Sequence, residues 1–257
     1  MALSSKQAAP IVTLHGGPSL PSSYMYPLEK VVPYRSIVYY DQLGCGKSDE
    51  PKDVKLYSIK DSVDDLKVLI KQLGIRRFHL YGHSYGGVLA FEYLKSVATK
   101  EEESTCLSAI LSSAPSSIPK LEQEFVRLTE ELRPKDHLVS TEEMDELFRI
   151  NHQCRTEEMP EELAEAYANV GTVWCGTAAI SDYVACPPPE DAKRMSSAMI
   201  MRGEYDFVAE DSLEAWKNMF NHKFVRCKTL EGCSHHGLYE NGVLYGETID
   251  SYFSEYD

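Results

Sequence analysis

The residues best suited to chemistry are a serine, an aspartate and a histidine that each follow a predicted β-strand. Residues 82–86 read GHSYG, a G-x-S-x-G pattern that lies between a β-rich run and a helical pattern. A serine in such a tight turn presents its hydroxyl above the end of a sheet, where it can attack a carbonyl carbon. We therefore predict that Ser84 is the nucleophile of an acyl-transfer reaction.

A serine nucleophile needs a base, and the base needs an acid that orients it. Asp206 and His235 directly follow two later predicted strands, in the chain order serine, acid, histidine. We predict a triad of Ser84, Asp206 and His235. His236 is the alternative base, although the Gly-Cys-Ser run before His235 favours the first histidine.

A further motif could stabilise the charge that such a reaction develops on oxygen. Residues 15–18 read HGGP after the first predicted strand, and adjacent glycines let backbone N–H groups face a carbonyl oxygen. We predict an oxyanion hole formed by the N–H groups of Gly17 and Tyr85. His15 and His83 are expected to be structural and to hydrogen-bond the loops that contain them.

Residues 44–48, GCGKS, are similar to a phosphate-binding loop. That motif requires glycine five positions before the glycine of the Gly-Lys-Ser run, and Asp41 occupies this position. The spacing therefore excludes the nucleotide-binding interpretation.

Composition limits the possible partners. A length of 257 residues with 43% hydrophobic content predicts one large domain or a domain with an insertion, and the net charge of −14 disfavours nucleic acid. No run approaches the roughly 18 apolar residues of a membrane span, and the start of the chain has no apolar block, so we expect a cytoplasmic protein without membrane contact. The seven cysteines form no C-x-x-C pair, which predicts free thiols, no metal site and no cofactor.

Two parts of the chain alternate short apolar runs with helical patterns. The runs predict strands at residues 11–14, 37–40, 78–81, 107–111, 198–201 and 224–230, and the patterns predict helices at 58–73, 88–97, 211–220 and 243–253. Alternating strands and helices imply a parallel sheet that is covered on both faces.

This alternation is interrupted by a segment in which only helices are predicted, near residues 120–132, 141–151 and 160–170. Ligands bind at the carboxyl ends of the strands in open α/β sheets, so we expect the helices to cap the active site. The predicted fold class is α/β: a mostly parallel sheet flanked by helices. Its core comprises residues 1–115 and 195–257, and residues 116–194 form an inserted helical cap.

The motifs at residues 15–18, 41–48 and 82–87 resemble those of the proline iminopeptidases, including the tricorn-interacting aminopeptidases. The resemblance continues at 203–206 and 233–235 and covers nearly the whole chain. It implies an α/β-hydrolase fold with a helical cap. It also implies a cofactor-free cytosolic aminopeptidase that releases an N-terminal residue, often proline, from short peptides or amino-acid amides.

In that family acidic residues bind the substrate's free amine. Glu204 is similar to one of them, and Asp182 is the one candidate for the second, which comes from the cap. Residues 120–170 carry 14 acidic and six basic side chains, a net charge of −8 that would attract an amine, although exposed helix faces explain most of these charges more simply.

The incomplete pair of acidic residues leaves other functions open. The first is an esterase, lactonase or amidase that acts on a small metabolite. The second is a non-hydrolytic enzyme or a ligand-binding protein that reuses the fold.

Two smaller departures from the family concern the start of the chain. Ser19 replaces the family's usual glycine after the HGGP motif, and the β-hairpin that precedes this motif in the family has no counterpart. An uncovered sheet edge invites pairing with another chain, so the sequence permits an oligomer.

Overall fold

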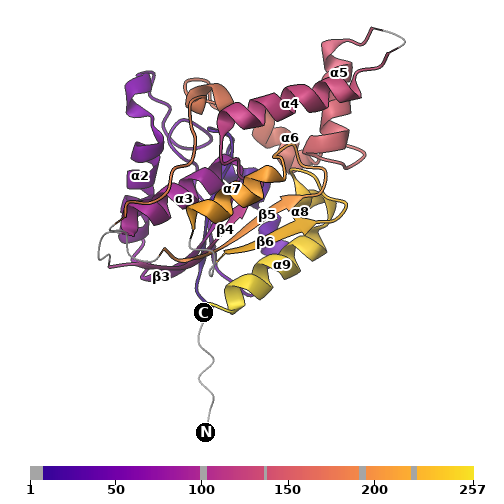
Figure 1. Ribbon diagram of the computed structural model, residues 1–257. Helices are drawn as coiled ribbons and strands as arrows, with labels where there is room; N and C mark the ends of the chain where they lie inside the picture. Colours follow the sequence, from indigo (N-terminus) through magenta and orange to yellow (C-terminus); the bar gives the residue numbers. More distant parts are fainter. Residues whose placement is uncertain (1–7, 99–102, 136–137, 191–194, 221–224) are drawn as a thin grey trace.

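The computed structural model describes residues 8–98, 103–135, 138–190, 195–220 and 225–257. It contains a six-stranded parallel sheet in the order β2-β1-β3-β4-β5-β6 (Figure 1). The strands are β1 (Ile11–Leu14), β2 (Ile37–Val38), β3 (Arg77–His83), β4 (Thr105–Ser112), β5 (Ser197–Gly203) and β6 (Val225–Leu230). This sheet confirms the predicted parallel α/β architecture.

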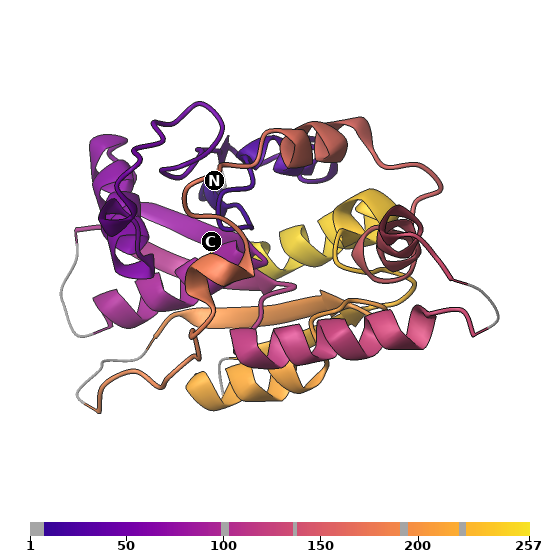
Figure 2. The ribbon, with the colours of Figure 1, turned by 90° about the horizontal axis from the view of Figure 1, so that it is seen from above.

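Helices cover both faces of the sheet, as Figure 2 shows from above. Side chains alternate along each strand, so that Leu80 packs into one hydrophobic core and Tyr81 into the other. The first core includes residues of α2 (Ile59–Gln72), α3 (Tyr85–Val97) and α7 (Asp211–Met219), and the second includes residues of α1 (Leu28–Val31) and α9 (Gly242–Ser254). Burial on both faces explains why the central strands are nearly continuous apolar runs.

The ends of α2 illustrate how local sequence sets an element. The Ser58 hydroxyl accepts a hydrogen bond from the Asp61 N–H at 3.0 Å, which satisfies a free donor at the helix start. Gly74 follows the helix with φ +64°, a conformation that costs glycine little. Ser58 and Gly74 therefore mark the start and the end of α2.

Three differences from the predicted elements stand out. β2 has two residues rather than four, because Tyr39 and Tyr40 lie outside the ladder. The predicted helix near residues 141–151 divides into α5 (Thr141–Phe148) and a π-helix, η3 (Arg149–Gln153). The short helix α8 (Gly237–Glu240) was not predicted, and the first residue of the strand expected at 224–230 lies outside the described residues.

The segment between β4 and β5 folds over the carboxyl ends of the strands (Figure 1). It contains α4 (Ile118–Leu132), α5, η3, α6 (Glu161–Ala168) and the short η4 (Thr177–Ile180). Its described residues contribute to the sheet pattern only an isolated antiparallel bridge between Ser117 and Val184. We refer to this segment as the cap.

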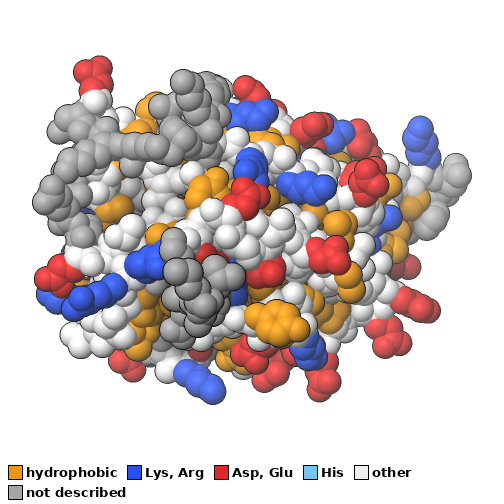
Figure 3. All heavy atoms as spheres, turned by 90° about the horizontal axis from the view of Figure 1, so that it is seen from below, with side chains coloured by type: hydrophobic (Ala, Val, Ile, Leu, Met, Phe, Trp, Pro, Cys, Tyr) orange, Lys and Arg blue, Asp and Glu red, His pale blue; other side chains and the backbone are white. Residues whose placement is uncertain are grey.

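Most charges of the cap lie on exposed helix faces. Arg127 pairs with Glu124 and Glu131 on α4, and its side chain is 51% exposed. Acidic and basic side chains are also interspersed on the opposite side of the molecule, which Figure 3 shows from below. Exposed ion pairs of this kind contribute little to stability.

The structure bears on the predicted free thiols and on the predicted absence of membrane spans. All seven cysteines are free thiols, as predicted. Among the described residues, none of the helices has the length and apolar character needed to cross a bilayer.

The loop that is similar to a phosphate-binding motif is a turn built around Asp41. Its carboxylate accepts hydrogen bonds from the N–H groups of Ser22 and Lys47 at 2.8 and 2.9 Å, and the Ser48 hydroxyl donates to its backbone carbonyl at 2.5 Å. The Lys47 N–H and the Ser48 hydroxyl, two groups that a phosphate-binding loop would direct at a phosphate, are therefore both occupied by Asp41.

Candidate active site

Ser84 lies in a strained turn at the junction of β3 and α3. Its φ of 55° and ψ of −122° place a non-glycine residue in a region that L-amino acids rarely adopt. The turn closes because Gly82 and Gly86 have no side chains: a Cβ on Gly82 would overlap the Gly86 carbonyl, and a Cβ on Gly86 would overlap the carbonyl of Leu14 in β1. The sequence pattern therefore holds the Ser84 hydroxyl at the carboxyl end of the sheet.

Asp206 and His235 are brought together by the loops that follow β5 and β6. The His235 Nδ1 lies 2.9 Å from Asp206 Oδ1, which also accepts a hydrogen bond from the Val208 N–H at 2.9 Å. Burial raises the pKa of Asp206, but the attraction of His235 and these hydrogen bonds outweigh that effect and lower it overall. An ionised Asp206 requires the proton of His235 on Nδ1, which leaves Nε2 able to accept one.

His236 is in a different environment from its neighbour. Its Nε2 lies 3.1 Å from the Tyr167 hydroxyl oxygen, and burial holds its pKa well below the usual range. Of the two candidate bases, the structure pairs His235 with Asp206 and leaves His236 neutral and without a carboxylate partner among the described residues.

The predicted oxyanion donors lie beside Ser84. Gly17 has φ +116°, and Tyr85 is the first residue of α3, where backbone N–H groups lack helical partners. Neither of these N–H groups donates a hydrogen bond to another described residue, whereas the neighbouring Gly16 N–H donates to the Tyr24 hydroxyl at 2.8 Å. The positive end of the α3 dipole favours negative charge at this point.

His15 and His83 both hydrogen-bond nearby backbone. The His15 Nε2 accepts from the Gln42 N–H at 2.8 Å, and its Nδ1 donates to the Gly16 carbonyl at 3.0 Å. The His83 Nε2 donates to the His235 carbonyl at 2.9 Å, while its Nδ1 accepts from the Tyr24 hydroxyl at 2.9 Å. Burial lowers the pKa of His15 to about 4 and that of His83 to about 3, so both are neutral near pH 7.

One group of side chains could be considered for metal binding. The donor atoms of His15, Asp41 and Cys45 lie within 4.8 Å of one another. The His15 and Asp41 atoms already accept hydrogen bonds from backbone N–H groups, and burial raises the pKa of the Cys45 thiol to about 12. This donor set is suited to packing the loop rather than to holding a cation.

Ser84 and His235 both line a pocket of about 370 Å³ under the cap, which we call the catalytic pocket. Its walls are mainly apolar and are formed by Leu20, Ile118, Leu121, Val170, Ile180 and Phe207. The Phe207 ring stacks on the imidazole of His235 with 4.1 Å between centroids. Among the described residues that line the catalytic pocket, none is Asp or Glu.

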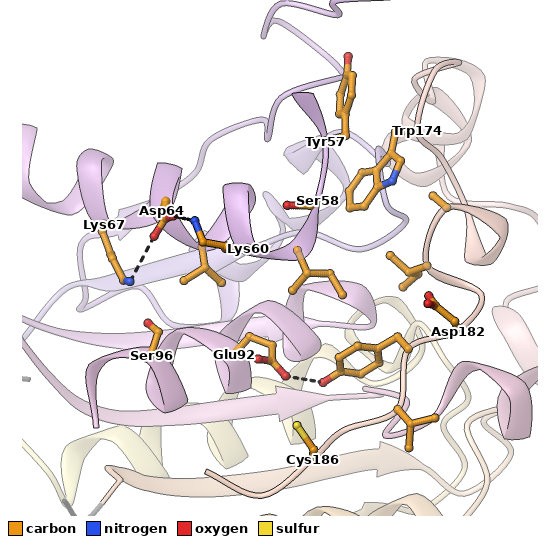
Figure 4. Close-up of a pocket in the computed structure, with 16 residues that line it drawn as sticks. Tyr57, Ser58, Lys60, Asp64, Lys67, Glu92, Ser96, Trp174, Asp182 and Cys186 are labelled. Carbon is orange, nitrogen blue, oxygen red and sulfur yellow. Dashed lines mark hydrogen bonds and ion pairs between the residues drawn. The ribbon is translucent and has the colours of Figure 1, made fainter. Parts of the chain in front are cut away.

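The two predicted amine-binding residues lie outside this pocket. Glu204 is exposed, and its carboxylate accepts a hydrogen bond from the Gly232 N–H at 2.9 Å. Asp182 lines a separate groove of about 850 Å³ between α2, α3 and the segment that returns from the cap (Figure 4). We call this second cavity the outer groove; Ile180 lines both cavities.

The Alpha/beta hydrolase family model matches residues 11–245, and the chain belongs to this family. A proline iminopeptidase from Saccharolobus solfataricus is 36% identical over 176 residues, which are 63% of this chain and 55% of that protein. The chain therefore matches only about half the length of this relative. Its similarity confirms the predicted resemblance to proline iminopeptidases.

Solved structures show the same fold. A proline iminopeptidase from Mycobacterium smegmatis has a TM-score of 0.82 at 20% identity, over 98% of this chain and 91% of that chain. An esterase from Exiguobacterium antarcticum has a TM-score of 0.68 at 22% identity, over 96% of this chain and 92% of that chain. The predicted α/β-hydrolase fold is confirmed.

Sequence reasoning missed two residues that contact the site. Phe207 is adjacent to the predicted acid, and this position could have marked it as a wall of the pocket. Tyr24 joins the Gly16 N–H to His83 from a 3-10 helix, η1 (Ser22–Met25), and no spacing in the sequence indicates that contact.

Proposed function

We propose that the chain is a serine hydrolase that transfers an acyl group to Ser84 and then to water. His235 takes the Ser84 proton as the hydroxyl attacks, and Asp206 holds the imidazole and stabilises its positive charge. The N–H groups of Gly17 and Tyr85 receive the oxyanion. His235 then protonates the leaving group and activates the water that releases the acyl group.

The observation that carries this proposal is the 2.9 Å contact between Asp206 and the Nδ1 of His235, on the wall of the pocket that also contains Ser84. We expect Ser84→Ala to reduce kcat by roughly 10³-fold or more and to leave the unfolding transition in place. Cys175→Ala is the matched control because it removes the thiol from the lining of the same pocket. A Ser84→Ala variant with nearly wild-type turnover would overturn the assignment.

The sequence relatives support an aminopeptidase, an enzyme that releases N-terminal proline or another small residue from peptides or amides. Such an enzyme must hold a substrate ammonium group, and Glu204 remains the proposed contact from the sequence. Its carboxylate would have to exchange the Gly232 N–H for the substrate.

The cytoplasmic location expected from the sequence also stays a prediction.

A specific observation favours a second candidate, an esterase, lactonase or amidase for a neutral acyl group. The described lining of the catalytic pocket is mainly apolar and contains no carboxylate, so an ammonium group buried there would lose its hydration without a counter-charge. A pocket of about 370 Å³ suits a small molecule or a short peptide in either case.

Four substrates separate the two candidates. They combine a cyclopentanecarbonyl or a prolyl group, which share a five-membered ring and differ only in the ring amine, with p-nitrophenol or p-nitroaniline as the leaving group. An aminopeptidase is expected to prefer prolyl p-nitroanilide, whereas the neutral-acyl enzyme is expected to prefer p-nitrophenyl cyclopentanecarboxylate. Hydrolysis of none of them, together with no reaction of wild-type protein with a fluorophosphonate, would favour a binding protein or a non-hydrolytic enzyme.

A further inference from the structure

A π-helix in the cap contacts both loops that hold the proposed acid and base. The Nδ1 of His152, in η3, lies 2.9 Å from the carbonyl oxygen of Tyr205, the residue before Asp206. The carbonyl oxygen of His152 accepts a hydrogen bond from the His235 N–H at 3.2 Å. One cap residue therefore bridges the loop after β5 and the loop after β6.

The ring contact has a defined direction. A carbonyl oxygen can only accept a hydrogen bond, so the Nδ1 of His152 carries a proton and donates a hydrogen bond to the Tyr205 carbonyl. The peptide plane of Tyr205 precedes Asp206, and a rotation of that plane would move the carboxylate relative to His235. The His152 ring thus limits a motion that would break the 2.9 Å contact of the proposed dyad.

Neighbouring contacts hold the same two loops. The Gln153 carbonyl accepts from the His236 N–H at 2.9 Å, and the Arg155 N–H donates to Glu240 at 2.7 Å. Glu240 also accepts a hydrogen bond from the Ser234 N–H. The guanidinium of Arg155 lies over the Tyr205 ring, 3.8 Å from its centroid.

The π-helix is itself fixed by a buried cation. Arg149 is 5% exposed, and its guanidinium donates to Glu146 and to the carbonyl groups of Cys154 and Thr156. The turn that presents His152 is therefore braced from within the cap. π-helical turns occur frequently at functional sites, where they redirect a side chain or a carbonyl.

We infer that His152 is a positioning residue, which fixes Asp206 and His235 in the geometry that proton transfer requires. This inference rests on the proposed serine hydrolase function. It means that the cap contributes to the arrangement of the triad and not only to the wall of the pocket. Loss of the ring contact should slow the chemical step more than it weakens binding, because His152 does not line the catalytic pocket.

The test compares His152→Asn, which keeps a side-chain N–H near the Nδ1 position, with His152→Leu, which removes it. We expect His152→Leu to lower kcat for p-nitrophenyl acetate by roughly 10-fold or more with little change in KM, and His152→Asn to recover most of that loss. Asn151→Ala is the matched control. It breaks a 2.8 Å hydrogen bond to the Leu147 carbonyl within the same cap turn and leaves the triad loops untouched.

The rate at which a fluorophosphonate labels each variant separates the possible failures. Wild-type protein that is neither labelled nor active would overturn the proposed function and this inference with it. Active wild-type protein with an equally active His152→Leu variant would overturn only the role of His152.

The control variants exclude a general loosening of the cap. A His152→Asn variant as slow as His152→Leu, or an Asn151→Ala variant with the same loss, would assign the effect to such loosening and would contradict the inference. If His152→Leu does not fold, His152→Ala takes its place, because it also removes the donor to the Tyr205 carbonyl. We expect its kcat to fall by roughly 10-fold, and a kcat within about threefold of wild type would overturn the role of His152.

Discussion

The catalytic pocket and the outer groove differ in volume, and they differ more in how their polar groups are buried and paired. The groove, at about 850 Å³, is more than twice as large as the catalytic pocket, at about 370 Å³. Three of its ionic groups form ion pairs at the surface, where Asp64 lies 2.8 Å from Lys60 and 3.3 Å from Lys67. The larger cavity is therefore the one whose charged groups are in contact with solvent.

The catalytic pocket is bordered by a buried pair of polar side chains. Asp206 and His235 are each 4% exposed and contact each other, and Ser84 adopts a strained backbone conformation beside them. Charge in such a site is hardly screened by solvent, whereas the pairs of the groove are. The smaller cavity is therefore the one that combines buried polar groups with a strained backbone, which is why we propose it as the active site.

The largest expected effect in this comparison is that of Asp206→Asn. An amide would still hydrogen-bond His235 but would no longer stabilise a positive imidazole or fix its tautomer. We expect kcat to fall by about 10⁴-fold, with the fold retained. Steady-state kinetics with p-nitrophenyl acetate and circular dichroism measure the two quantities, and a loss smaller than 10-fold would contradict the assignment of the acid.

A smaller effect is expected from Tyr24→Phe. The Tyr24 hydroxyl joins the Gly16 N–H to the Nδ1 of His83, and its removal leaves both buried groups without that partner. We expect the free energy of unfolding to fall by about 1–3 kcal/mol and kcat by roughly 10-fold. Urea unfolding and initial rates provide these values.

Tyr57→Phe is the matched control for that change. Tyr57 lines the outer groove, and its hydroxyl donates to the Pro51 carbonyl at 2.7 Å. Its removal should lower stability but leave kcat unchanged. An equal loss of kcat in both variants would mean that the hydroxyl of Tyr24 has no special connection to the catalytic pocket.

The buried histidines predict that acid destabilises the protein. His15 and His83 have pKa values of about 4 and 3 in the folded state, and that of His236 is also far below the usual range. The unfolded chain binds protons at these residues below about pH 6.5, so the free energy of unfolding falls as pH falls from 6.5 towards 4. Each histidine contributes up to about 1.4 kcal/mol per pH unit in that window.

Urea unfolding at pH 7, 6 and 5 measures this dependence. The ion pairs of the outer groove should not contribute in this range, so Asp64→Asn is expected to leave the slope unchanged. Constant stability between pH 7 and pH 5 would show that the three imidazoles are not held neutral.

The smallest effect is expected from Asp182→Asn, the same chemical change as Asp206→Asn but in the outer groove. Asp182 is exposed, so the free energy of unfolding should change by less than about 0.5 kcal/mol. The activity should also be retained with all four substrates. A selective loss with the two prolyl substrates would instead assign amine binding to this residue.

The sequence was sufficient for the sheet and the main helices, because these depend on periodicity and on turns of fixed form, while the triad stays a prediction. The Ser84 turn needs glycine at positions 82 and 86, and that need is visible as a pattern. The shorter β2 and the four-residue α8 could not be predicted, since they carry too few residues for a periodic signal.

Contacts between distant segments were beyond the sequence. The direction of a side chain in a loop depends on the turn and on what packs against it. The sequence therefore could not show that Phe207 lines the catalytic pocket and that Glu204 lies outside it. The bridge from His152 to Tyr205 joins positions 53 residues apart and has no local signature. The contacts of Tyr24 with Gly16 and His83 could not be predicted for the same reason.

Identification of the residue that reacts with a fluorophosphonate tests the central claim most directly. Intact and peptide mass spectrometry of labelled wild-type protein should show one adduct, on Ser84, and the Ser84→Ala variant should show none under the same conditions. An adduct on another residue, or equal labelling of the two proteins, would contradict the account of the catalytic pocket.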